Sequence, residues 1–270
     1  MISPEGTRFE VGNEESDPSN ASSPYQENKR GDKMLELERI REGLLQSLKF
    51  QTKGIIEGNI PDGFRYLREK SKMAPDGAVP MDQREADLLM VDRLRDPSLE
   101  KKIDAFKKIT KDLPDDQKLF EIAQRVFKIM GGLRADFDRA EARRAKEKPT
   151  QLIGEVGGND NPGVCRHRAL LFQILASECG LQTMMRNGSA WDENFINGSA
   201  HAWNEVKAGG RTFLVDTSLP PEGEGFNSVS YPEFVKKGGF PDVTDFKERK
   251  NQPINPKLKF MYFGNEGRLY

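Results

Sequence analysis

Apolar residues recur at helix-like spacing along the first half of the chain. The first such stretch starts at residue 33 and carries Leu35, Leu37, Ile40, Leu44, Leu45 and Leu48. The same pattern predicts a helix over residues 83–94, one with the apolar stripe Ile103, Phe106, Ile109 and Leu113, and one that begins at Asp115. Gly131 and Gly132 end the last of these. Residues 54–80 predict an irregular connection, and the charge-rich residues 136–148 predict a solvated helix.

The pattern changes after Pro149. A helix is predicted from Cys165 to Cys179, where apolar residues cover nearly the whole circumference, which is typical of a helix buried on most sides. Three short strands follow, near residues 181–186, 201–207 and 211–217. Residues 222–270 are predicted to be mostly loop, with a short helix around residues 232–237.

These patterns divide the chain into three parts. Residues 1–32 are rich in Ser, Asn, Glu, Gly and Pro, so they are predicted to be disordered. Residues 33–148 are predicted to form a helical region that packs on the core. Residues 149–270 are predicted to form an α+β core with a loop-rich C-terminal extension.

Composition excludes several classes of protein. The 270 residues include 42 basic and 43 acidic ones, so the net charge of −1 gives no reason to expect a nucleic acid or a membrane surface as partner. No apolar run approaches the length of about 18 residues that a transmembrane helix needs, and residues 1–20 lack the apolar region of a classical signal peptide. Two cysteines argue against a disulfide scaffold, so a cytoplasmic protein is expected, with non-classical export as an alternative.

The chemically informative residues are a cysteine, a histidine and an aspartate, in that order. Cys165 lies in the first turn of the buried helix, where unpaired N–H groups and the helix dipole favour a thiolate. Gly209-Gly210 predicts a two-residue hairpin turn, which would make His201 and Asp216 diagonal neighbours on one face. A thiol near an imidazole that a carboxylate orients is the arrangement for nucleophilic attack on a carbonyl.

Neighbouring polar residues have plainer interpretations. His167 is expected to pack or hydrogen-bond within the first turn rather than act as the base, because residues two apart on a helix point apart. Cys179 is expected to be a structural thiol. A metal site of cysteine, histidine and aspartate lacks a CxxC or HExxH motif, so neither a metal nor a cofactor is expected. Basic residues such as Arg166 and Arg168 are unfavourable in a first helical turn, so their presence calls for an explanation, such as an anionic partner or a buried acid.

Three of these segments, taken together, resemble the transglutaminase-like superfamily, whose core is the papain-like cysteine-protease fold. They are Gly163-Val164-Cys165, His201-Ala202-Trp203-Asn204-Glu205-Val206 and Leu214-Val215-Asp216-Thr217-Ser218. The longer run from Gly163 to Phe172 is also similar to the regulatory domain preceding certain plant Raf-like kinases. The resemblance covers roughly residues 149–220. It implies an α+β fold in which a central helix that starts at the cysteine packs on a small antiparallel sheet, preceded by a helical region.

The resemblance also implies roles for these residues. Cys165 would be the nucleophile, His201 the general base and then acid, and Asp216 the residue that orients the imidazole. The implied activity is cysteine-dependent acyl transfer on peptide or side-chain amides, as a protease, deamidase or transglutaminase, with a protein or peptide substrate and a thioester intermediate. The backbone N–H of the cysteine can supply half of an oxyanion hole. Candidates for the other donor and for the walls of the cleft are Gln151, Asn159, Asn161, Arg166, Trp191 and Trp203.

Two other functions fit the same residues. The similarity to a kinase-regulatory domain suggests a catalytically silent binding module of the same fold. A polar N-terminal segment would also suit an exported effector with the same chemistry. Oligomeric state is open in all three cases.

Overall fold

The computed structural model describes residues 24–67, 88–132, 150–191, 199–218, 230–244 and 261–264. It divides the chain into two compact units, residues 1–38 and 39–270. In chain order the elements are α1 (Pro24–Lys53), β1 (Ile55–Glu57), β2 (Arg65–Leu67), β3 (Leu88–Met90), α2 (Pro97–Thr110), α3 (Asp115–Ile129), β4 (Thr150–Leu152), the 3-10 helix η2 (Ile153–Glu155), α5 (Cys165–Glu178), β5 (Gln182–Trp191), β6 (Ser199–Ala208), β7 (Arg211–Val215), α6 (Tyr231–Lys236) and β8 (Met261–Gly264).

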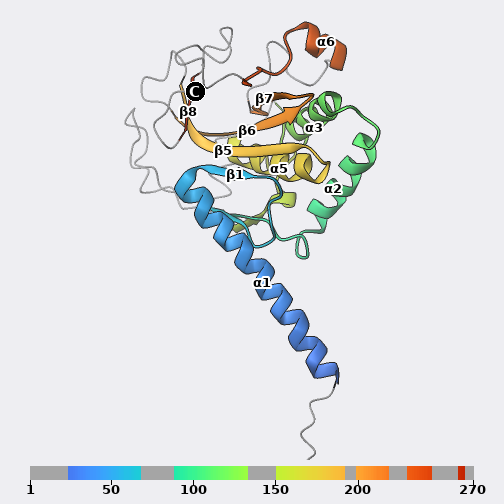
Figure 1. The fold of residues 1–270 in the computed structure, drawn as a ribbon, viewed down its shortest axis with the longest axis vertical. Helices are drawn as coiled ribbons and strands as arrows, with labels where there is room; N and C mark the ends of the chain where they lie inside the picture. The colour runs from blue at the N-terminus through green and yellow to red at the C-terminus, as the bar shows by residue number, and fades with distance from the viewer. Residues whose placement is uncertain are drawn as a thin grey trace, which may run out of the picture. The chain divides into compact units, whose positions relative to one another are not determined.

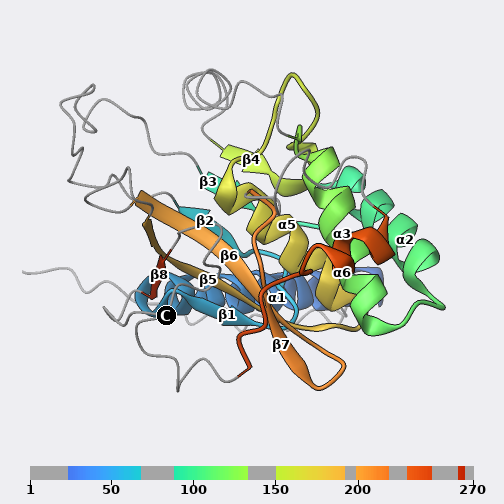
Figure 2. The same ribbon diagram turned by 90° about the horizontal axis from the view of Figure 1, so that it is seen from above.

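The larger sheet is antiparallel and carries the central helix. Its strands follow the order β1-β5-β6-β7, and β8 also pairs with β5 (Figure 1). Helix α5 packs against β5 and β6, with α2 and α3 in contact with it as well (Figure 2). Every residue of α5 from Arg166 to Ala176 is buried. The α+β class, the helix buried on most sides and the three predicted strands are therefore confirmed.

The hairpin of β6 and β7 has the predicted register. Gly209 and Gly210 have φ angles of 55° and 77°, and positive φ at both central residues is what a two-residue type I′ turn requires. Ala208 faces Arg211, and Asn204 faces Val215. This register places the side chains of His201 and Asp216 on the same face of the hairpin.

A second sheet occupies a region that the sequence pattern assigned to helix and loop. Strand β3 pairs with β2 in antiparallel and with β4 in parallel orientation. The helix predicted over residues 83–94 is therefore wrong from Leu88 onward, and the connection predicted over residues 54–80 contains β1 and β2. A short apolar run such as Leu88-Leu89-Met90-Val91 fits a buried strand as well as a helix. Its pairing with β2 and β4 determines that it forms a strand. Residues 83–87 and the helix predicted over 136–148 lie outside the described residues.

Helix α1 differs from prediction in its start and in the face that it buries. It begins at Pro24, within the residues 1–32 that the composition predicts to be disordered, and proline occupies the favoured first helical position. The predicted leucine stripe is exposed, with 38% to 67% of the surface accessible in Leu35, Leu37, Leu44, Leu45 and Leu48. The buried face instead carries Gly43, Ser47 and Phe50. A Cβ on Gly43 would overlap the backbone of residues 62–64, so close packing rather than aliphatic bulk selects this face.

Helices α2 and α3 bury their predicted inner faces against α5. Leu119, Phe120, Ala123, Val126 and Phe127 are all buried, as are Ile103 and Phe106. Ile109 is 38% exposed instead. Among the described residues, none of the helices combines the length and the apolar character that a membrane span requires.

Asp96 joins the start of α2 to the 3-10 helix η2. Its carboxylate is fully buried, and it accepts hydrogen bonds from the N–H of Leu99 at 3.0 Å and of Gly154 at 2.6 Å. Asp96→Ala should therefore lower the free energy of unfolding by about 2–4 kcal/mol, because it removes an N-cap and leaves a buried N–H unpaired. Chemical denaturation checks this value. The matched control is the exposed Asp104 of α2, whose replacement by alanine should change stability by less than about 0.5 kcal/mol.

Candidate active site

Cys165 is the first residue of α5, and a tightly packed loop leads into it. Gly163 donates its N–H to the carbonyl of Met130 at 3.1 Å, and a Cβ at this position would overlap the Met130 sulfur. Val164, with extended backbone, is the N-cap and supplies no side-chain cap. The N–H groups of the first turn therefore lie beside the thiol, where their dipoles favour a negative charge.

His201 and Asp216 meet across the β6–β7 hairpin. His201 lies on β6 and Asp216 directly follows β7, and His201 Nε2 is 2.6 Å from Asp216 Oδ2. Their side chains are only 11% and 4% exposed. Asp216 Oδ1 accepts the N–H of Ser218 at 2.8 Å, and the ring of Trp203 stacks near the imidazole with 6.4 Å between the ring centroids. The carboxylate is thus held in place and holds one nitrogen of the imidazole.

The thiol and the imidazole shift each other's pKa in opposite directions. Burial raises the pKa of Cys165, but a hydrogen bond with His201, the nearby charges of His201 and Arg166, and the N–H of Ala202 outweigh it and lower the pKa. Burial lowers the pKa of His201, but the Asp216 carboxylate and the Cys165 thiolate outweigh it and raise the pKa well above 6.5. Since Nε2 faces Asp216, Nδ1 is the nitrogen left for the thiol. These shifts favour a thiolate–imidazolium pair.

The two cations of the first turn, Arg166 and Arg168, have different environments. The buried Arg166 lies close enough to Cys165 for its charge to lower the thiol pKa. Arg168 is fully buried, and its guanidinium donates hydrogen bonds to four backbone carbonyls, those of Met130, Gly132, Gly163 and Thr217. The sequence pattern flagged the second arginine as unexplained, but backbone acceptors cannot be identified from residue types.

The candidate oxyanion donors have different environments. The side chain of Gln151 on β4 is 3% exposed, and its amide has no hydrogen-bond partner among the described residues. Asn161 donates instead to the carbonyl of Glu155 at 3.2 Å within the loop, and Asn159 is exposed. Trp203 is buried beside His201. The side chain of Trp191 lies outside the described residues.

A buried polar network, which the sequence pattern missed, fixes α5 on the sheet. Gln173 donates to the carbonyls of Gly58 and Thr183, at 2.7 and 3.1 Å. Its Oε1 accepts from the hydroxyl of Thr183 at 2.9 Å and from the amide of Asn204 at 3.1 Å. Asn204 also donates to the carbonyl of Ala169 at 3.2 Å. Because Asn204 lies on the strand that carries His201, the network sets the position of β6 against the helix of Cys165.

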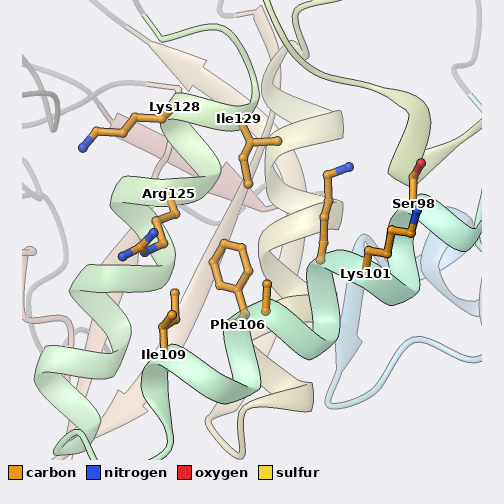
Figure 3. A pocket seen from close by; sticks show the side chains of 9 residues that line it. Ser98, Lys101, Phe106, Ile109, Arg125, Lys128 and Ile129 are labelled. Atoms are coloured by element: carbon orange, nitrogen blue, oxygen red, sulfur yellow. The ribbon is translucent and has the colours of Figure 1, made fainter.

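A hollow lies between α2 and α3, and the residues of the candidate site do not line it. Its volume is about 480 Å³, and Figure 3 shows apolar side chains framed by cationic ones: Ser98, Lys101, Lys102, Ala105, Phe106, Ile109, Arg125, Lys128 and Ile129 line it. Among the described residues, no group of three His, Cys, Asp or Glu side chains could hold a metal ion.

Comparison with known proteins identifies the family. A family model described as EDR1/CTR1/ARMC3, peptidase-like, matches residues 47–222. No curated protein and no solved structure matches the chain in the corresponding comparisons. The family includes the regulatory domain that precedes plant Raf-like kinases, as the motif around Cys165 suggested, and a peptidase-like domain is consistent with the papain-like fold. The chain belongs to the EDR1/CTR1/ARMC3 peptidase-like family.

Proposed function

We propose that this protein is a cysteine-dependent acyl-transfer enzyme that acts on peptide or side-chain amides. The observation that carries the proposal is the chain of contacts from Cys165 at the start of α5, through His201, to Asp216 at 2.6 Å from the imidazole. Nucleophile, base and orienting carboxylate in hydrogen-bonded sequence are the parts that covalent catalysis by a thiol requires. Membership of a peptidase-like family supports the same class of reaction.

The reaction runs in two halves. The Cys165 thiolate attacks the amide carbonyl carbon, a C–S bond forms, and the carbonyl oxygen becomes an oxyanion. The tetrahedral intermediate collapses as imidazolium His201 gives its proton to the leaving nitrogen, which leaves a thioester and an amine or ammonia. Neutral His201 then takes a proton from water or from an amine that attacks the thioester, and the thiolate is restored. Water gives proteolysis or deamidation, and an amine gives transamidation.

Gln151 is the side chain that we assign to the oxyanion, together with the backbone N–H of Cys165. A buried amide without a partner costs about 1–3 kcal/mol in the ground state. An oxyanion that forms during the reaction would accept its N–H and offset that cost in the transition state. Asn161 is a weaker candidate, because its amide already holds the loop carbonyl of Glu155.

A silent regulatory module is the second candidate. It is favoured by the family itself, because one branch of it is a regulatory domain that precedes a kinase. Such a module would use the same fold to bind a partner and would form no thioester.

The reactivity of Cys165 should reveal the thiolate–imidazolium pair. We expect iodoacetamide to alkylate Cys165 at least about tenfold faster than Cys179 at pH 6, because only the thiolate reacts and neighbouring groups lower the pKa of Cys165. Burial raises the pKa of Cys179, which makes it an internal control. His201→Ala should move the midpoint of the Cys165 profile up to the ordinary thiol range or above, since burial then acts with less opposition. Mass spectrometry of the two cysteine peptides gives both profiles, and a wild-type midpoint near pH 8.5 would contradict the pair.

Acyl-enzyme formation separates the enzyme from the silent module. Incubation with a library of peptide amides and glutamine-containing peptides should give a thioester adduct on Cys165, together with released amine or ammonia. Cys165→Ala should abolish the adduct and reduce turnover by at least about 10³-fold, and Asp216→Asn should reduce turnover by up to about 10⁴-fold. If Cys165 is a reactive thiolate but no library member acylates it, the silent module replaces the enzyme as the better description.

The role of Gln151 predicts a separate kinetic signature. Gln151→Ala should lower kcat by about 10²-fold with little change in KM, because an oxyanion donor acts mainly in the transition state. The Cys165 alkylation profile should not change, since the thiolate itself does not depend on this amide. A rise in KM at constant kcat would instead identify Gln151 as a ground-state binding residue.

A further inference from the structure

We propose that Arg168 is a positioning residue of this site, whose buried guanidinium fixes the backbone that carries Cys165 relative to the backbone that carries Asp216. The effect on turnover rests on the proposed function, whereas the effect on the thiol does not. The hydrogen bonds that hold the Arg168 guanidinium go to backbone carbonyls. Its role is to hold other residues.

The guanidinium bridges three segments that are far apart in the sequence. Arg168 is 1% exposed, and its Nε donates to the carbonyl of Gly163 at 2.7 Å. Nη1 donates to the carbonyl of Thr217 at 2.6 Å. Nη2 donates to the carbonyls of Met130 and Gly132, at 3.1 and 2.9 Å. One side chain therefore ties together the loop before α5, the residue after Asp216 and the end of α3.

Two of these carbonyls lie next to the groups that must meet. Gly163 precedes Cys165 by two residues, and Thr217 directly follows Asp216. A shift of either segment would change how Asp216 meets His201, or how His201 meets the thiol. Catalytic geometry is sensitive to displacements of about 1 Å. A bridge between Gly163 and Thr217 therefore limits the movement of Cys165 relative to Asp216.

The chemistry of this position suits arginine and not lysine. A planar guanidinium offers five N–H donors in a fixed fork, whereas an ammonium offers three from one compact centre, which cannot reach acceptors on three separate segments. The guanidinium also lies over the ring of Phe127, 5.2 Å from its centroid. Burial lowers the pKa of Arg168 to about 10 although the charges of Asp216 and Cys165 raise it, so the group stays cationic at neutral pH.

A buried cation at this point also acts through its charge. Burying an ion without a counter-charge is costly, and neutral carbonyls offset that cost only in part. The anionic forms of Asp216 and Cys165 are near enough to raise the pKa of the arginine. By reciprocity, the arginine favours those anionic forms. This accounts for a cation in the first turn of a helix, where the dipole alone would disfavour it.

The test compares arginine variants at two positions. Arg168→Lys keeps the charge but loses the fork, and Arg168→Gln keeps two N–H donors with no charge to bury. Arg93→Lys is the matched control, because Arg93 also joins distant segments, through the carbonyl of Ile60, Asp62 and Glu178, and is not among the residues at the site. All three variants should be less stable than the wild type.

Only the Arg168 variants should change the thiol. In folded Arg168→Lys or Arg168→Gln, alkylation of Cys165 by iodoacetamide at pH 6 should fall about tenfold, which corresponds to a midpoint about one pH unit higher. Hydrogen exchange should accelerate in the peptide that contains Ser218, whose N–H is held by Asp216. Arg93→Lys should leave both readouts at their wild-type values.

Each other outcome counts against the proposal. An unchanged exchange rate at Ser218 in a folded Arg168 variant shows that the bridge does not hold this segment, whatever the reactivity of the thiol. An unchanged alkylation profile shows that the site does not depend on it. If both Arg168 variants fail to fold, the arginine supports the domain as a whole and the specific role is wrong. Slow alkylation of wild-type Cys165 would instead count against the proposed function, and the exchange readout still decides the role of Arg168.

Discussion

A helix that is buried along its length must satisfy every polar group that it carries from within the protein. Helix α5 is in this position, because all residues from Arg166 to Ala176 are buried. Two polar side chains on it find their partners in other segments. Gln173 bonds to the turn after β1, to β5 and to β6. Arg168 bonds to the segment after α3, to the loop before α5 and to the residue that follows Asp216. The polar groups of one buried helix therefore fix the positions of β5, β6, the end of the β6–β7 hairpin and the segment after α3 relative to that helix.

The candidate site lies where this constraint is tightest. Cys165 is the first residue of the buried helix, and the imidazole of His201 comes from β6. Asn204, on the same strand, is hydrogen-bonded to Gln173 of the helix. Asp216 comes from the end of β7, where the next carbonyl accepts from Arg168. Scaffold and chemistry are thus not separate layers. The groups that anchor α5 also set the distances among the thiol, the imidazole and the carboxylate, which favours a rigid, preorganised site.

The sequence was informative where structure is determined locally and uninformative where distant contacts decide. A Gly-Gly pair that requires positive φ predicts its own turn, so the hairpin register and the pairing of His201 with Asp216 followed from it. The apolar circumference of α5 likewise predicted its burial. Strand β3 was missed because its conformation depends on pairing with β4, which lies far along the chain. The buried face of α1 was missed because the small residues Gly43 and Ser47, not the leucines, allow close packing. Carbonyl acceptors leave no trace in residue types, so Arg168 could be noticed but not explained.

The energetics of the unusual residues bear on whether this fold still performs chemistry. A buried arginine and a buried amide without a partner both destabilise the folded state relative to apolar residues of similar size. A domain that only binds a partner would gain stability if an apolar residue of similar size replaced Gln151, whose amide has no partner among the described residues. Local rules of protein stability are typically broken at functional sites, where the strain serves a reaction. Gln151 on β4 and Arg168 in the first turn of α5 both depart from those rules. Both observations favour an acyl-transfer site over a silent module.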